Sequence, residues 1–82
     1  MVEVIEEPVR VAAVFNGRHT EIRWLQWRGR DYRIRQVTDH WRAREGRALF
    51  HYFAVTDGAM LFELRFHAEQ LAWELTRTYC EG

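Results

Sequence analysis

The sequence contains no lysine, a single cysteine and a single proline. Because Cys80 stands alone, the chain has neither an internal disulfide nor a zinc site made of several cysteines, and a reducing compartment fits this usage. All twelve basic residues are arginine, so every fixed positive charge is a planar guanidinium that can stack as well as form ion pairs. Genome base composition, or selection for ion-pair networks at high temperature, would produce the same bias.

Signatures of several enzyme and membrane classes are also missing. No apolar run approaches the roughly 18 residues of a membrane span, and the opening MVEVIEEPVRVAAVF is acidic, unlike a secretory signal. The histidines do not follow the H-x-x-x-H or H-E-x-x-H spacing of metal sites, and the glycines form no phosphate-binding loop. We therefore expect a cytoplasmic protein that is not an enzyme, has no cofactor or metal and does not enter a membrane.

What the chain does have is an uneven charge distribution behind a formal net charge of zero. Residues 18 to 47 carry nine arginines against four acidic residues, a net charge of +5, whereas residues 1 to 17 carry −2 and residues 48 to 82 carry −3. A basic segment between acidic flanks predicts either a negatively charged partner or pairing within the fold.

Apolar and polar residues alternate along most of the chain, with short turns between the runs, and this pattern predicts an all-β fold. With 82 residues, of which 48% are hydrophobic, we expect one domain over residues 1–82 with a thin core. The expected architecture is a single small antiparallel meander of five to six strands, curled into an open barrel. The six expected strands cover residues 9–15, 21–27, 31–44, 48–56, 60–66 and 72–79.

Two of these segments carry a local ambiguity. Residues 31–44 are too long for one flat strand, so a bend with a bulge is expected between Val37 and Asp39. The last segment also has an apolar stripe at helical spacing, which makes a helix the alternative there. The predicted core consists of Val11, Ala13, Phe15, Leu25, Trp27, Ile34, Val37, Phe53, Val55, Phe62, Leu64, Trp73 and Leu75.

The stretch RWLQWRGRDYRIR, residues 23 to 35, mixes five arginines with three aromatic residues. A type II′ turn centred on Gly29 and Arg30 would place Trp27 opposite Tyr32 and Trp24 opposite Arg35. Side chains alternate between faces, so Leu25, Trp27, Tyr32 and Ile34 are then expected in the core. The opposite face would carry Trp24, Gln26, Arg28, Arg33 and Arg35.

An aromatic ring beside guanidiniums is an arrangement that binds single-stranded nucleic acid, because the ring stacks on a base while arginines contact phosphates. The expected nucleic-acid-binding residues are Trp24, Arg28, Arg33 and Arg35, supported by Trp41, Arg42 and Arg44. Structural roles are the alternative for the same residues. These would be a Trp24–Arg35 cation–π pair, an Arg28–Asp31 ion pair and Trp41 as a core wedge.

Two longer stretches carry a resemblance to a known family. They are WLQWRGRDYRIRQVTDHWR (24–42) and YFAVTDGAMLFELRFHAEQLAWELTRTY (52–79), together 47 of 82 residues. The chain resembles a family of small uncharacterised bacterial domains, found alone or at the C-terminus of catalytically inactive Y-family DNA polymerase-like proteins of the DNA-damage mutagenesis cassette. The resemblance implies an all-β domain associated with DNA repair, and it brings no catalytic residues.

The expected function is therefore a non-catalytic accessory domain that binds nucleic acid or a DNA-repair protein. The alternative is a protein-interaction or self-assembly module, since exposed edge strands in so small a sheet favour a homodimer. A small-molecule sensor is a third interpretation, and it requires a concave apolar pocket.

Overall fold

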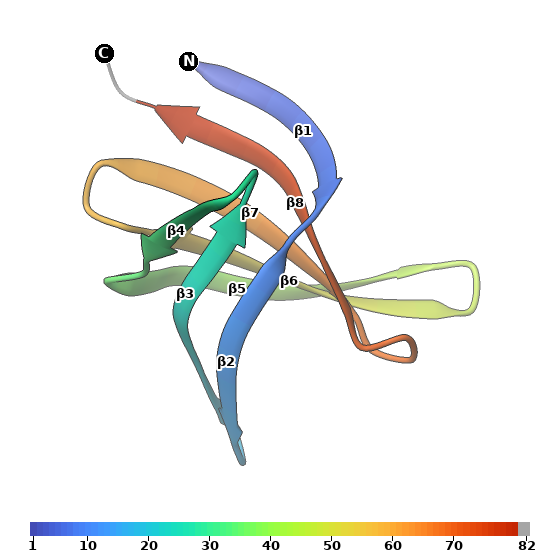
Figure 1. Ribbon diagram of the computed structural model, residues 1–82. Helices are drawn as coiled ribbons and strands as arrows, with labels where there is room; N and C mark the ends of the chain where they lie inside the picture. The colour runs from blue at the N-terminus through green and yellow to red at the C-terminus, as the bar shows by residue number, and fades with distance from the viewer. Residues whose placement is uncertain (81–82) are drawn as a thin grey trace.

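The computed structural model describes residues 1–80, and these residues form two antiparallel β-sheets with no helix among them (Figure 1). That part of the chain accordingly has no helical segment long and apolar enough to cross a membrane. The strands are β1 (Val2–Pro8), β2 (Arg10–Asn16), β3 (His19–Trp27), β4 (Arg30–Arg33), β5 (Gln36–Glu45), β6 (Ala48–Thr56), β7 (Met60–His67) and β8 (Ala72–Cys80).

The larger sheet has five strands in the order β1-β8-β7-β6-β5, and the smaller has three in the order β2-β3-β4. Neither sheet closes on itself, so the predicted all-β, antiparallel and open barrel-like architecture is confirmed. The final segment is a strand, as predicted, and not a helix. The strand number differs from the five to six expected, because residues 2–8 form a strand of their own and residues 31–44 are divided between the two sheets.

The chain passes between the sheets at two corners. At the first, between β1 and β2, the Val9 amide donates to the Trp73 carbonyl at 3.3 Å. At the second, between β4 and β5, the Ile34 amide donates to Arg23 in the smaller sheet and the Arg35 amide to Thr56 in the larger sheet, both at 2.8 Å. Each corner therefore keeps its backbone groups paired while the chain changes sheets.

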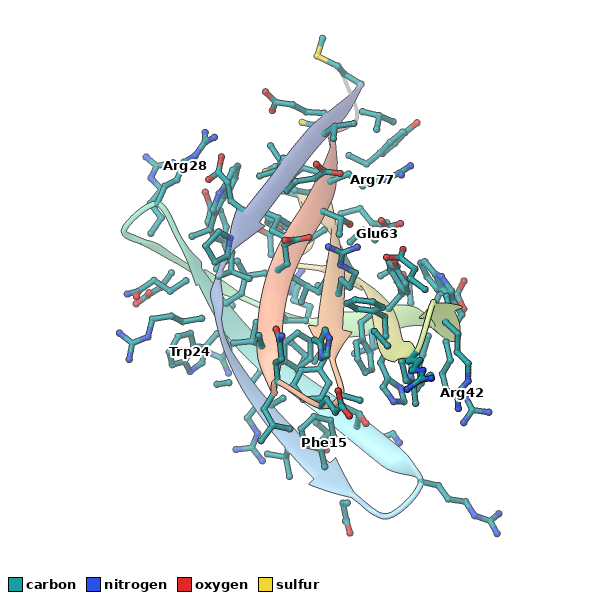
Figure 2. The ribbon with its side chains drawn as sticks, turned by 90° about the vertical axis from the view of Figure 1, so that its right-hand side faces the viewer. Phe15, Trp24, Arg28, Arg42, Glu63 and Arg77 are labelled. Atoms are coloured by element: carbon teal, nitrogen blue, oxygen red, sulfur yellow. The ribbon has the colours of Figure 1, made fainter. Side chains whose placement is uncertain are left out.

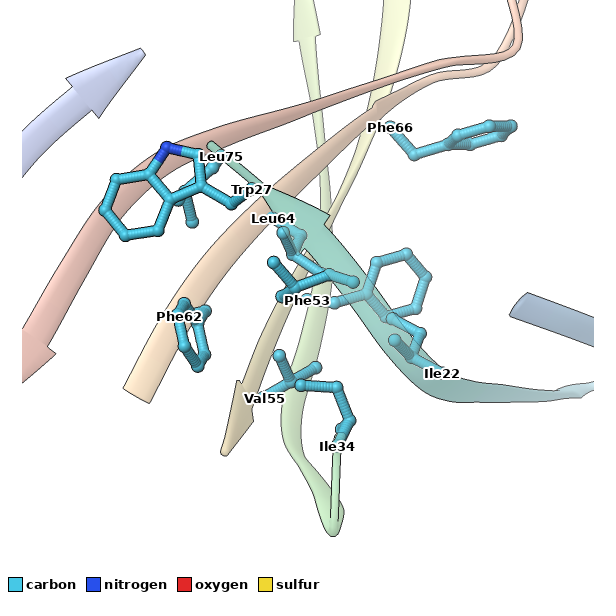
Figure 3. Close-up of a cluster of buried hydrophobic side chains, with 10 residues drawn as sticks. Ile22, Trp27, Ile34, Phe53, Val55, Phe62, Leu64, Phe66 and Leu75 are labelled. Carbon is cyan, nitrogen blue, oxygen red and sulfur yellow. The ribbon is translucent and has the colours of Figure 1, made fainter. Parts of the chain in front are cut away.

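The core lies between the two sheets (Figure 3). Its fully buried side chains are Leu25, Phe53, Val55, Phe62, Leu64 and Leu75, all of which were predicted. Phe15 was predicted to be buried but is 57% exposed, because the β2–β3 hairpin extends past the edge of the larger sheet (Figure 1). Ile22 and Phe66 are buried although neither was predicted.

A bulge in β3 explains why Ile22 is buried. Ala12 pairs with Trp24 and Ala13 with Ile22, so Arg23 is an extra residue on the β3 side. The bulge turns Ile22 and Leu25 inward, whereas Arg23 and Trp24 are both exposed. Strict alternation along the strand would have given Ile22 and Leu25 opposite faces. A second bulge lies between Val37 and Asp39, where it was predicted.

The turn between β3 and β4 is centred one residue earlier than predicted. Arg28 and Gly29 have φ angles of 52° and 76°, the pattern of a type I′ turn, and Trp27 pairs with Arg30. Trp24 therefore lies opposite Arg33, not opposite Arg35. Because the shift moves each partner by two positions, the paired residues of β3 and β4, such as Trp24, Leu25 and Arg33, keep their predicted faces.

Candidate nucleic-acid interface

Three arginines of the basic segment gather around a groove of about 500 Å³ between the start of β3 and the chain from the end of β4 into β5. Four basic side chains line it, and we call it the basic groove: His19, Arg23, Arg33 and Arg35. The β3 bulge brings Arg23 into this set, since it adds an exposed residue to the strand. The corner at Ile34 and Arg35 leads the chain along the side of the groove opposite to β3, and so places Arg33 and Arg35 there.

Trp24 stands next to the basic groove. Its side chain is 43% exposed, and it pairs directly with Arg33 across β3 and β4. Directly paired residues in antiparallel strands place their side chains side by side on the same face. An aromatic ring and a guanidinium are therefore neighbours on the outer face of the smaller sheet.

The position of Arg35 depends on a glycine. A Cβ atom added to Gly58 would lie 2.9 Å from Arg35 Nη1 and 3.0 Å from its Cδ, so only glycine leaves room for this side chain. The nearby Asp57 carboxylate accepts hydrogen bonds from the amides of Ala59 and Met60 at 2.9 and 2.8 Å. Asp57 therefore stabilises the β6–β7 turn, and it forms no ion pair with Arg35.

Arg28 has a structural role instead of the predicted one. Its guanidinium donates to Glu7 of β1 at 2.6 and 3.0 Å, and it lies 4.6 Å from the centre of the Trp27 ring. Trp27 Nε1 donates to the same carboxylate at 2.9 Å. The hydrogen bonds from Arg28 and Trp27 lower the pKa of Glu7, and this anion ties the turn to the larger sheet.

The other structural alternatives raised by the sequence are wrong. Asp31 accepts a hydrogen bond from Gln26 at 3.1 Å and does not pair with Arg28. Within residues 1–80, the cation–π contacts are Arg28 on Trp27 and Arg65 on Phe50, so Trp24 and Arg35 form none.

The protein neutralises part of the charge of the basic groove, because Glu21 also lines it. Arg23 reaches Glu21 at 3.4 Å, and both side chains of this pair are more than half exposed. Arg33 and Arg35 have no carboxylate partner within the described part of the chain. Exposed ion pairs contribute little to stability, so these guanidiniums are available to an anionic ligand.

The remaining predicted residues do not extend this surface. Trp41 lies on the outer face of the larger sheet, where its ring stacks on Tyr52 with centroids 5.3 Å apart and planes at 4°, so it is not a core wedge. Arg42 and Arg44 pair with His51 and Leu49 on the opposite, core-facing side of β5. Figure 2 shows Trp24 and Arg42 on opposite sides of the molecule.

Sequence reasoning missed His19 and Arg23, which complete the basic groove. Alternation from Leu25 and Trp27 placed Arg23 on the core face, and only the bulge reverses this. His19 begins β3, sixteen positions before Arg35, and no local pattern connects the two.

Comparisons with models of protein families, with curated proteins and with solved structures returned no match for this chain.

Proposed function

We propose that this protein is a non-catalytic domain that binds single-stranded nucleic acid along the basic groove, with Trp24 stacking on a base. The observation that carries the proposal is the pairing of Trp24 with Arg33 next to a groove that also contains Arg23 and Arg35. These guanidiniums would contact consecutive phosphates while the indole ring holds a base. Such stacking contributes about 1–3 kcal/mol per base.

The charge distribution favours an anionic polymer over a small anion. The basic groove continues past Arg33 and Arg35 into a second hollow that these two residues share with Asp57. A strand laid along both hollows would meet three arginines, together with Glu21 in the first hollow and Asp57 in the second. Phosphate neutralisation of this kind releases condensed counterions and drives binding without sequence preference.

The resemblance carried by residues 24–42 and 52–79 supplies the proposed setting, a cytoplasmic DNA-repair complex in which this domain holds a single strand. A repair protein that carries the strand would be a partner of the same assembly.

Fluorescence anisotropy with a labelled single-stranded oligonucleotide tests the proposal. If three phosphates are contacted, the plot of log affinity against log salt concentration should have a slope of about −2. Duplex of the same sequence should bind more weakly, because its paired bases cannot stack on Trp24. Absence of salt-sensitive binding at low ionic strength would eliminate the proposal.

A matched pair of variants locates the interface. The triple variant R23Q/R33Q/R35Q removes the three groove arginines, and R30Q/R44Q/R47Q removes the same charge from exposed arginines that do not line the groove. We expect the first variant to lose most of the affinity and most of the salt dependence, and the second to lose little. Equal losses in both would mean that overall charge, not this groove, binds the oligonucleotide.

Self-association is a second candidate, favoured by the exposed edge of the larger sheet. Val2 and Val4 of β1 are 52% and 67% exposed, and β1 has no neighbour on its outer side. The bulge that follows Val4 and the proline at position 8 limit edge pairing to the first half of the strand. We propose that β1 of a second copy pairs with this exposed edge.

Sedimentation should then show a concentration-dependent dimer that V4K abolishes. A monomer at all concentrations would refute self-association through β1.

A further inference from the structure

A further hollow, distinct from the two that form the proposed interface, lies between the β2–β3 hairpin and the core-facing side of β5, β6 and β7. It measures about 540 Å³ and shares only Thr20 with the lining of the basic groove. Five of its lining residues carry rings, and we call it the aromatic cleft: Phe15, His40, His51, Phe53 and Phe66.

Four of the rings lie side by side on the core-facing side of β5, β6 and β7. His40 stacks on Phe53 with centroids 4.3 Å apart and planes at 7° and on His51 at 5.5 Å, and His51 is the cross-strand neighbour of Phe66. The fifth ring, Phe15 of the β2–β3 hairpin, packs against Phe66 at 5.6 Å, although more than half of its surface is exposed. Leu71, which also lines the cleft, is 71% exposed, so exposed apolar surface from two separate segments adjoins the hollow, and such contiguous patches mark binding sites.

The polar groups of the cleft are positive or neutral. Arg18 from the hairpin tip and Arg42 from β5 line it, no carboxylate does, and neither arginine has an ion pair within residues 1–80. His40 Nε2 lies 3.3 Å from His51 Nδ1, within hydrogen-bonding distance. Burial, together with His40 and Arg42, lowers the pKa of His51 and favours its neutral form.

We infer that the aromatic cleft binds a small planar aromatic molecule that carries one carboxylate. The rings would stack on the faces of the ligand, and Arg18 and Arg42 would each donate charge-assisted hydrogen bonds to its carboxylate. The volume is within the range of small-molecule sites. This site is separate from the proposed nucleic-acid interface and does not depend on it.

Isothermal titration with 2-naphthoate tests the inference, with uncharged 2-naphthamide as the matched ligand. We expect 2-naphthoate to bind and 2-naphthamide to bind at least about tenfold more weakly, since a charge-assisted hydrogen bond is lost. In NMR spectra the ring signals of His40 and His51 should shift on binding, while those of His67, outside the cleft, should not. No binding of 2-naphthoate, or equal binding of the two ligands, would overturn the inference.

Variants assign the contacts. Arg42→Gln and Arg18→Gln should each weaken 2-naphthoate binding by roughly tenfold, whereas Arg44→Gln, on the same face of β5 but outside the cleft, should leave it unchanged. Phe15→Ser should also weaken binding, and because Phe15 is more than half exposed, the variant should still fold. The R23Q/R33Q/R35Q variant should keep full affinity for 2-naphthoate. Loss of binding in that variant, or in Arg44→Gln but not Arg42→Gln, would refute the site.

Discussion

Arginines on the outer face of the five-stranded sheet lie among carboxylates, whereas two arginines beside the three-stranded sheet have no carboxylate partner in the described part of the chain. Arg65 pairs with Glu74 and lies 3.9 Å from Glu45, and Arg77 pairs with Glu63 at 3.3 Å. Arg33 and Arg35 have no such partner within the described residues. The acidic flanks of the sequence thus neutralise mainly the arginines of their own sheet.

One contact is the exception to this separation. Glu7 of the acidic N-terminal flank reaches the basic middle segment and pairs with Arg28. Net charge along the chain therefore identified the basic segment correctly, but it did not distinguish arginines that hold the fold from arginines that face a partner. The same distinction applies to Trp27 and Trp24, which lie three positions apart in β3.

The largest expected effect is the difference in stability between variants of these two tryptophans. Trp27 is buried and donates to Glu7, so Trp27→Ala should lower the free energy of unfolding by about 3–5 kcal/mol. Trp24→Ala should cost less than about 1 kcal/mol and should reduce oligonucleotide affinity. Urea denaturation measures the first quantity and anisotropy the second. Similar losses of stability in both variants would contradict the division between a core ring and a surface ring.

The next largest effect is the difference in stability between variants of Arg65 and Arg33. Arg65 is half-buried, pairs with Glu74 and lies over the Phe50 ring at 4.7 Å. Arg65→Ala should lower stability by about 1–3 kcal/mol, because the partly buried Glu74 loses its partner. Arg33→Ala should change stability by no more than about 0.5 kcal/mol. Thermal unfolding of both variants checks this, and a large loss for Arg33→Ala would show that it has an unrecognised structural contact.

A smaller effect is expected at Gly58, which has a φ of 101° and lies under Arg35. Gly58→Ala should lower the free energy of unfolding by about 1–2 kcal/mol, because an L-residue is strained at positive φ. It should also displace Arg35 and weaken oligonucleotide binding. Gly46→Ala is the control, since Gly46 has positive φ but open space around it. Unchanged oligonucleotide affinity in Gly58→Ala would mean that Arg35 does not contribute to oligonucleotide binding.

The smallest effect is a pH dependence from His51. Because its pKa is lowered in the folded protein, mainly by burial, the unfolded chain binds more protons just below the ordinary histidine pKa. Stability should therefore fall as the pH drops from about 7.5 to 5.5. His51→Phe should flatten this slope, because it removes the titrating group. An unchanged slope in His51→Phe would contradict the role given to burial.

Much of the fold followed from the sequence because it depends on local pattern. Period-two alternation gave the strand class and most of the core, and the excess length of residues 31–44 indicated the bulge before Asp39. The faces of the paired residues on either side of the Arg28–Gly29 turn were also correct, although the turn itself was placed one residue late. These faces were unaffected because each cross-strand partner shifted by two positions, whereas Arg28 became a turn residue.

The candidate site was less predictable, because three non-local features determine it. The β3 bulge exposes Arg23 beside Trp24, the corner at Ile34 directs Arg35 over Gly58, and the two-sheet arrangement separates Trp41 and Arg42 from Trp24. None of these features has a local sequence signal as clear as alternation. Seven residues predicted to form one surface are consequently divided among the groove, the Glu7 contact and the two faces of β5.

By itself, the sequence determined an all-β chain with a basic middle, acidic flanks and inward-facing Leu25, Trp27 and Ile34, because hydrophobic alternation and charge are properties of short segments. Only the tertiary structure decided which arginines are already paired and which rings share a hollow. Pairing depends on distances between strands remote in sequence, and those distances are set by where bulges and corners send the chain.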